Sequence, residues 1–116
     1  MIAHIILLEP RPDLSDRDRD AALEAFRRAA ADVSDIRRFK IGRRVTHGLP
    51  GYEQLMTRNF EYAIVIEFDD VEALKRYLAA PAHHVLGTLF TTATTAALAY
   101  DYRMVDAQDA ATLLST

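Results

Sequence analysis

The chain contains no cysteine. Disulfide bonds, thiolate nucleophiles and cysteine-based metal sites are therefore excluded. Histidine-based metal motifs are missing as well, because no two histidines stand four residues apart and no His-Glu-x-x-His sequence occurs. His83 and His84 are adjacent, and His4 and His47 are remote from them along the chain. We expect neither a metal ion nor another bound cofactor.

Clusters of positive charge and long apolar runs are also missing. Fourteen Lys and Arg stand against seventeen Asp and Glu, which gives a net charge of -3, and no basic block offers a surface for nucleic acid. The apolar stretch at residues 2–8 is far shorter than the roughly 20 residues that cross a bilayer, and it lacks the flanks of a signal peptide. We expect a cytoplasmic protein that binds neither nucleic acid nor a membrane.

The composition is that of one globular domain. Of the 116 residues, 50% are hydrophobic and 27% are charged, which is typical of a soluble protein with a single core. We expect this domain to span residues 1–105, followed by a tail at residues 106–116 whose structure the pattern does not predict.

Four strands are predicted from apolar and alternating runs. They lie at residues 2–8, 36–45, 60–68 and 98–105. The first is apolar on both faces, with His4 on the face of Ile2, Ile6 and Leu8. The second is more polar, which is typical of an edge, and its Gly42 is a candidate for a bulge or a bend. The last has Leu98, Tyr100, Tyr102 and Met104 on one face.

Helices are predicted between these strands. Ser15 is a good N-cap, and Leu23, Phe26, Ala30 and Val33 form a stripe at helical spacing. A second helix follows the capping residues Asp69 and Asp70 and breaks before Pro81, and a third stretch runs over residues 83–97. Residues 46–59 contain Gly48, Pro50 and Gly51 but no phosphate-binding motif, so they predict a long turn in which Leu55 and Met56 either cap a pocket or pack on a dimer.

The order strand, helix, strand, strand, helix, strand predicts an α+β, ferredoxin-like βαββαβ fold with an antiparallel sheet. Helices cover only one face of such a sheet. Because several strands are apolar on both faces, the other face needs a cover, and a second copy of the same sheet is the simplest one. We therefore expect a homodimer that forms an α/β barrel.

Several segments resemble the stress-responsive A/B barrel (Dabb) family. They are residues 1–8, the strand and helix start at residues 60–74, the Tyr-x-x-x-Pro-Ala-His sequence at residues 77–83, and Tyr100-Asp101-Tyr102. The resemblance covers roughly residues 1–105 and implies a dimeric barrel. One group in the family, resembling olivetolic acid cyclase, closes linear polyketides by an aldol reaction without a cofactor. In that group the matching residues Tyr77 and His83 form the functional pair, and His4 lines the same site.

An aldol closure needs a base and a donor for the enolate oxygen. We expect His83 to be the base, Tyr77 the donor and His4 the residue that orients a small, largely apolar carbonyl ligand. Each also has a structural interpretation: His83 and His4 as satisfied core histidines, and Tyr77 as a core aromatic. The chain is thus predicted to be a polyketide cyclase-like lyase, a non-catalytic stress-responsive or ligand-binding barrel, or a cofactor-independent dimeric-barrel monooxygenase. The 46–59 connection and the tail are departures from the family pattern.

Overall fold

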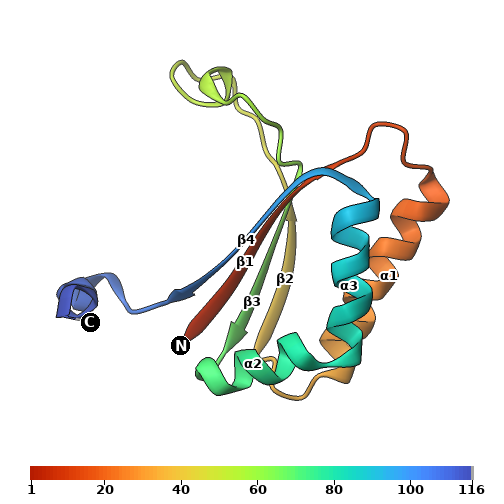
Figure 1. Ribbon diagram of the computed structural model, residues 1–116. Helices are drawn as coiled ribbons and strands as arrows, with labels where there is room; N and C mark the ends of the chain where they lie inside the picture. The colour runs from red at the N-terminus through yellow and green to blue at the C-terminus, as the bar shows by residue number, and fades with distance from the viewer. Residues whose placement is uncertain (116) are drawn as a thin grey trace.

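The computed structural model describes residues 1–115, so the last residue of the predicted tail, Thr116, lies outside the described residues. The strands and helices follow one another in the order β1 (Ile2–Pro10), α1 (Asp16–Asp32), β2 (Arg38–Arg43), η1 (Glu53–Leu55), β3 (Tyr62–Phe68), α2 (Val71–Ala79), α3 (Pro81–Thr92), β4 (Thr94–Arg103) and η2 (Ala107–Ser115). Figure 1 shows one twisted sheet with α1, α2 and α3 together on one of its faces.

The sheet has the strand order β2-β3-β1-β4, and every neighbouring pair is antiparallel. The central strand β1 pairs with β3 on one side and with β4 on the other. This is the predicted ferredoxin-like α+β topology, and it is confirmed. The polar strand β2 lies at the sheet edge as predicted, although it is shorter than residues 36–45. Gly42 pairs in register with Ala63, so of the two features expected there, a bulge or a bend, the bulge is absent.

The core fills the space between the sheet and the helices. Its strand residues alternate along β1 and β3, because successive side chains of a strand point to opposite faces. Within this layer Ile6, Ile64, Ile66, Phe68, Tyr77 and Leu86 are the largest side chains that are completely enclosed. Burying such side chains is the main driving force for folding.

Helix α1 starts at the predicted N-cap, where the Ser15 hydroxyl accepts a hydrogen bond from the amide of Asp18. The predicted stripe is partly wrong: Phe26 and Ala29 are buried, whereas Leu23 and Ala30 are exposed. Helix α1 contacts both the sheet and α3. The side of α1 that faces these neighbours contains Phe26 and Ala29, so it is shifted by one residue from the predicted Ala30.

Helices α2 and α3 meet at the predicted break. The carboxylate of Asp70 caps α2 by accepting from the amide of Ala73, and Pro81 occupies the first turn of α3. The prediction that α3 continues to residue 97 is wrong, since the helix ends at Thr92 and β4 starts at Thr94. β-Branched residues favour strands over helices, and this preference decides the boundary within the threonine run.

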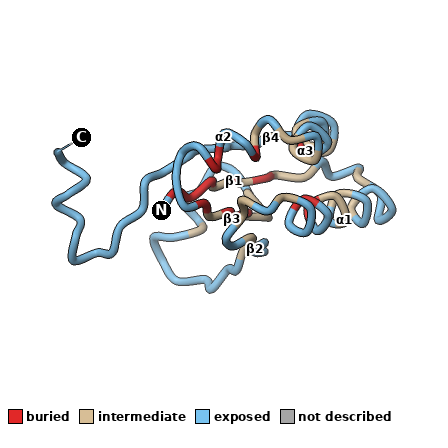
Figure 2. Tube along the Cα trace, turned by 90° about the horizontal axis from the view of Figure 1, so that it is seen from below, coloured by how far each residue is buried: buried red, intermediate tan, exposed pale blue. Residues whose placement is uncertain are grey.

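Two segments extend beyond the packed layers. Residues 44–61 form a long hairpin arm in which Gly48 and Gly51 take positive φ angles of 76° and 86°, as the predicted turn requires. The tail forms η2 after β4. Figure 2 shows both segments in pale blue over most of their length, because neither is buried by the rest of the chain. Within the part of the chain that the structure describes, no helix could traverse a lipid bilayer.

Candidate functional site

The structure brings the three predicted site residues together. His4 lies on β1, Tyr77 is in the last turns of α2, and His83 is in the first turn of α3. The His4 and Tyr77 ring centroids are 6.0 Å apart, and those of Tyr77 and His83 are 5.1 Å apart. Both contacts are edge-to-face. The break before Pro81 therefore turns the chain so that Tyr77 and His83 approach His4 from two different helices.

A fourth residue, Asp101 on β4, joins this cluster. It lies directly opposite His4 in the β1–β4 pair, so the two side chains share the helix-facing side of the sheet. The Nδ1 atom of His4 lies 2.5 Å from Oδ1 of Asp101. A carboxylate oxygen accepts hydrogen bonds, so Nδ1 of His4 is the donor in this pair, and in the tautomer that donates from Nδ1 the lone pair of Nε2 is free.

Two polar atoms of the cluster are buried without a hydrogen-bond partner. They are Nε2 of His4 and the hydroxyl of Tyr77. Most buried polar side-chain atoms in proteins have a partner, and leaving one without costs stability. Burial also raises the pKa of Tyr77 to about 12, so its hydroxyl keeps its proton and remains a donor near neutral pH.

His83 differs from His4 because it is only half-buried. Removal of its ring from water lowers its pKa, the nearby imidazoles of His4 and His84 lower it further, and a backbone hydrogen bond at Leu78 opposes the change. The neutral ring of His83 is therefore favoured at neutral pH. It lies edge-to-face against the completely buried ring of Tyr77.

The other polar candidates have structural surroundings. His84 is exposed, as its position next to His83 predicted. His47 packs edge-to-face on Tyr52 in the hairpin arm. Asp70 is the predicted capping residue, while Asp69 pairs with Arg37 and not with the helix. Among residues 1–115, no group of three or more His, Asp or Glu side chains is placed to hold a metal ion.

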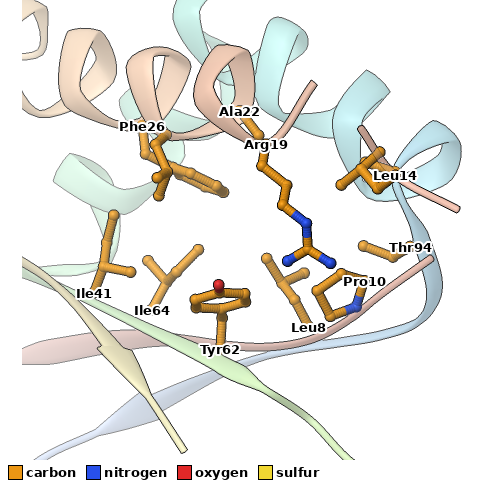
Figure 3. Close-up of a pocket in the computed structure, with 12 residues that line it drawn as sticks. Leu8, Pro10, Leu14, Arg19, Ala22, Phe26, Ile41, Tyr62, Ile64 and Thr94 are labelled. Carbon is orange, nitrogen blue, oxygen red and sulfur yellow. The ribbon is translucent and has the colours of Figure 1, made fainter. Parts of the chain in front are cut away.

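A cavity lies at the other end of the layer between sheet and helices. Its walls are Leu8, Pro10, Leu14, Arg19, Ala22, Leu23, Phe26, Ile41, Tyr62, Ile64, Ala93 and Thr94 (Figure 3). Neither His4, Tyr77 nor His83 contributes to its wall. The three predicted residues therefore do not line this cavity, and their cluster lies beside it, with His4 and Tyr77 buried and His83 half-buried.

Sequence reasoning missed Asp101 as a site residue. The signal was an acidic residue between Tyr100 and Tyr102, on the opposite face of β4 from these two aromatic side chains. Its importance depends on the β1–β4 register, because only the pairing of residue 101 with residue 4 puts the carboxylate beside the histidine. Local sequence patterns do not specify such a register between strands almost a hundred residues apart.

Solved structures with similar folds include three informative examples. A hydroxynitrile lyase from Passiflora edulis superposes with a TM-score of 0.77 at 14% identity, covering 90% of this chain and 94% of that chain. A dimeric ferredoxin-like protein of unknown function from Bacteroides fragilis gives 0.62 at 23% identity, covering 89% and 95%. A Dabb family protein from Mesorhizobium loti gives 0.68 at 15% identity, covering 90% and 96%.

Sequence identities this low support the fold alone. A search of curated proteins finds no significant match. The model of the stress responsive A/B barrel domain, in contrast, matches residues 2–104, a range that includes all four strands from end to end. This chain therefore belongs to the stress responsive A/B barrel domain family.

Proposed function

We propose that the protein is a homodimeric barrel that binds a small carbonyl compound beside His4 and Tyr77 and catalyses the making or breaking of a carbon–carbon bond next to the carbonyl group. The observation that carries this proposal is the Asp101–His4 hydrogen bond, which leaves His4 Nε2 without a partner in the same buried cluster as the free Tyr77 hydroxyl. A carboxylate that holds a histidine in one tautomer is a common arrangement for a general base.

The proposed roles follow from these two atoms. Nε2 of His4 removes a proton from the carbon next to the carbonyl, and the resulting imidazolium is stabilised by Asp101. The Tyr77 hydroxyl donates a hydrogen bond to the carbonyl oxygen as it becomes an enolate. The enolate carbon can then attack a second carbonyl, as in the aldol closure of a polyketide, and the His4 imidazolium returns its proton to the alkoxide that forms. In this proposal His4 takes the role of base that the sequence predicted for His83.

His83 has a second role in the proposal. Its half-buried ring packs against Tyr77, and its lowered pKa favours the neutral ring. A neutral imidazole can pass a proton between solvent and the enclosed site. The hydroxynitrile lyase from Passiflora edulis, which has the same fold, supports the choice of a lyase reaction at a carbonyl carbon, because the addition of cyanide to a carbonyl is also a carbon–carbon bond reaction.

The homodimer is supported by the sheet face opposite the helices. On that face Tyr100 is 55% exposed and Leu98 is 39% exposed, and structural neighbours from Bacteroides fragilis and Thermobifida fusca are described as dimeric. A second sheet would remove this apolar surface from water. We propose that it does so in this protein as well.

The reaction is tested without knowledge of the natural substrate. Exchange of the methyl protons of acetophenone in D2O, followed by NMR, reports removal of a proton next to a carbonyl, and release of benzaldehyde from mandelonitrile reports cleavage of a carbon–carbon bond. We expect the protein to accelerate at least the exchange. His4→Gln and Asp101→Asn should each lower this rate about 100-fold or more, whereas the exposed His84→Gln should not change it.

A non-catalytic ligand-binding barrel is the alternative outcome. If both reactions proceed at the buffer rate, or if His4→Gln keeps the full rate of exchange, the catalytic proposal is wrong. Circular dichroism of each variant must match that of the parent protein, so that a lost rate is not the result of a lost fold.

A further inference from the structure

We propose that the hairpin arm at residues 44–61 packs on the second copy of the chain in the dimer. The contact is made by the large apolar side chains that the arm exposes, which are Val45, Leu49, Tyr52, Leu55 and Met56. It rests on the homodimer of the proposed function, but not on the chemistry proposed at His4. The position and the construction of the arm indicate this partner.

The arm and the tail project from opposite ends of the sheet. The arm joins β2 to β3 at the end where β1 finishes, whereas the tail follows β4 at the end where β1 begins. Both segments extend to the side of the sheet away from α1 and α3 (Figure 1). A second sheet that covers the exposed sheet face fills the space between them, and the arm then lies beside that sheet.

The protomer is more extended than a compact domain of its length. Its radius of gyration is 15.8 Å, whereas about 13 Å is typical of a compact domain with this number of residues. The arm and the tail both lie outside the packed layers (Figure 2) and account for the difference. Two sheets that pack face to face are about 10 Å apart, and an extended chain gains roughly 3.3 Å per residue. The arm therefore needs only a few residues to reach a partner sheet.

The tip of the arm is held in shape by its own polar groups. The Glu53 carboxylate accepts hydrogen bonds from the backbone amides of His47 and Gly48. The rings of His47 and Tyr52 pack edge-to-face with their centroids 5.0 Å apart. The tip thus has an ordered structure before it meets a partner, and such preorganisation lowers the entropic cost of association.

The base of the arm is attached to the sheet through Glu9 at the end of β1. The Glu9 carboxylate pairs with Arg58 and accepts hydrogen bonds from the backbone amide of Asn59 and from the hydroxyl of Thr95. These contacts connect the arm to both β1 and β4. They fix the direction in which the arm leaves the sheet.

Apolar side chains remain on the outside of this ordered structure. Leu55 is 69% exposed and Met56 is 60% exposed, although the polar groups around them are hydrogen-bonded within the arm. Exposed apolar groups gathered in one segment mark an interaction site. Because the arm adjoins a sheet face that is itself exposed and apolar, one partner, a second copy of the chain, covers both.

The first test uses a spin label, which the absence of native cysteine makes specific. Leu55→Cys without isotope labelling carries a nitroxide on the arm and is incubated with the ¹⁵N-labelled parent chain until the subunits have exchanged. Any broadened amide signal then arises from a label on the partner. We expect signals of the sheet to lose more intensity than those of α1. The control Asp20→Cys, at an exposed position on α1, should leave the partner's signals at full intensity.

The second test adds charge to the arm. Leu55→Glu combined with Met56→Glu should raise the dissociation constant of the dimer about tenfold or more, because both charges would lose water on association. Val85 on α3 offers a matched control, since it is 56% exposed on the helix side of the protein. Val85→Glu should leave the dissociation constant, measured by analytical ultracentrifugation, within about twofold of the parent value. Circular dichroism of all variants should match the parent protein.

Two results would overturn the arm contact while leaving the dimer in place. The first is full signal intensity in the ¹⁵N-labelled partner of the spin-labelled Leu55→Cys chain. The second is an unchanged dissociation constant for the double glutamate variant. A parent protein that sediments as a single chain would overturn the homodimer and the arm contact together, and the exchange of acetophenone would still test the chemistry separately.

Discussion

The two faces of the sheet are made by the same strands but have different surroundings. On the helix side Ile64, Ile66 and Phe68 are completely enclosed. On the other face Tyr100, Tyr102 and Leu98 are 55%, 48% and 39% exposed. Alternate residues of each strand point to opposite faces, so one strand takes part in both. The comparison shows that the chain completes one of its two apolar layers by itself and leaves the other open.

The enclosed face also contains the polar exception. His4 is 4% exposed and is the one polar or charged residue counted among the buried residues of the described chain. On the open face, by contrast, polar groups such as Arg38 and Glu67 pair near the edge of the sheet. The chain thus buries His4 between its own sheet and helices, whereas Tyr100 and Tyr102 stay exposed on the open face.

The largest predicted effect breaks the open face. We expect the native protein to have twice the mass of the 13.0 kDa chain in light scattering after size exclusion. Tyr100→Glu puts a charge in the middle of the apolar surface, and desolvation of that charge should split the dimer. The measured mass should fall to that of one chain.

The matched control for that variant is Ala21→Glu, which adds the same charge on the exposed side of α1. It should leave the mass unchanged. A native protein that has the mass of one chain at micromolar concentration would contradict the dimer, as would a Tyr100→Glu variant that keeps the double mass.

The next effect concerns the polar pair on the enclosed face. Asp101→Ala removes the acceptor for Nδ1 of His4 and leaves that buried group without a partner. The free energy of unfolding should fall by about 1–3 kcal/mol, measured by urea denaturation at equal protein concentration. Asp13→Ala removes a carboxylate from an exposed pair with Arg11 and should have little effect. Equal losses in the two variants would show that the His4–Asp101 pair has no special importance.

A smaller effect is expected from pH. The pKa of His83 lies below its ordinary value of 6.5 in the folded protein, so the unfolded chain binds more protons in this range. Stability should therefore decrease as the pH falls from neutral through 6.5, and the decrease should stop below the folded pKa. Urea midpoints at successive pH values should show a weaker decrease for His83→Gln than for His84→Gln. An identical decrease in both variants would contradict the assignment to His83.

Much of the fold could be predicted from the sequence because it depends on local patterns. Alternation predicted the four strands, Ser15 and Asp70 predicted where helices begin, and Pro81 predicted the break between α2 and α3. The end of α3 was missed because residues 93–97 are compatible with a helix or a strand, and pairing with β1 decides between them. The buried line of α1 was missed because packing against the sheet and α3 buries Phe26 and Ala29 and leaves Leu23 exposed.

The candidate site could be predicted only in part. The Tyr-x-x-x-Pro-Ala-His sequence and the position of His4 pointed to three residues that the fold does bring together. Asp101 required the register between β1 and β4. This register is a property of tertiary packing, which alternation and helical spacing along a single segment do not contain.

The most direct test of the account removes one oxygen atom. If the buried Tyr77 hydroxyl is kept for a ligand and not for the fold, Tyr77→Phe should be more stable than the parent protein, because an unpaired buried hydroxyl is lost while the ring stays in place. We predict a gain of about 1 kcal/mol, or roughly 3–6 °C in Tm at equal protein concentration. A Tm that falls by several degrees would contradict the account, since it would mean that the hydroxyl stabilises the folded protein and that the His4–Tyr77 cluster is part of its structure.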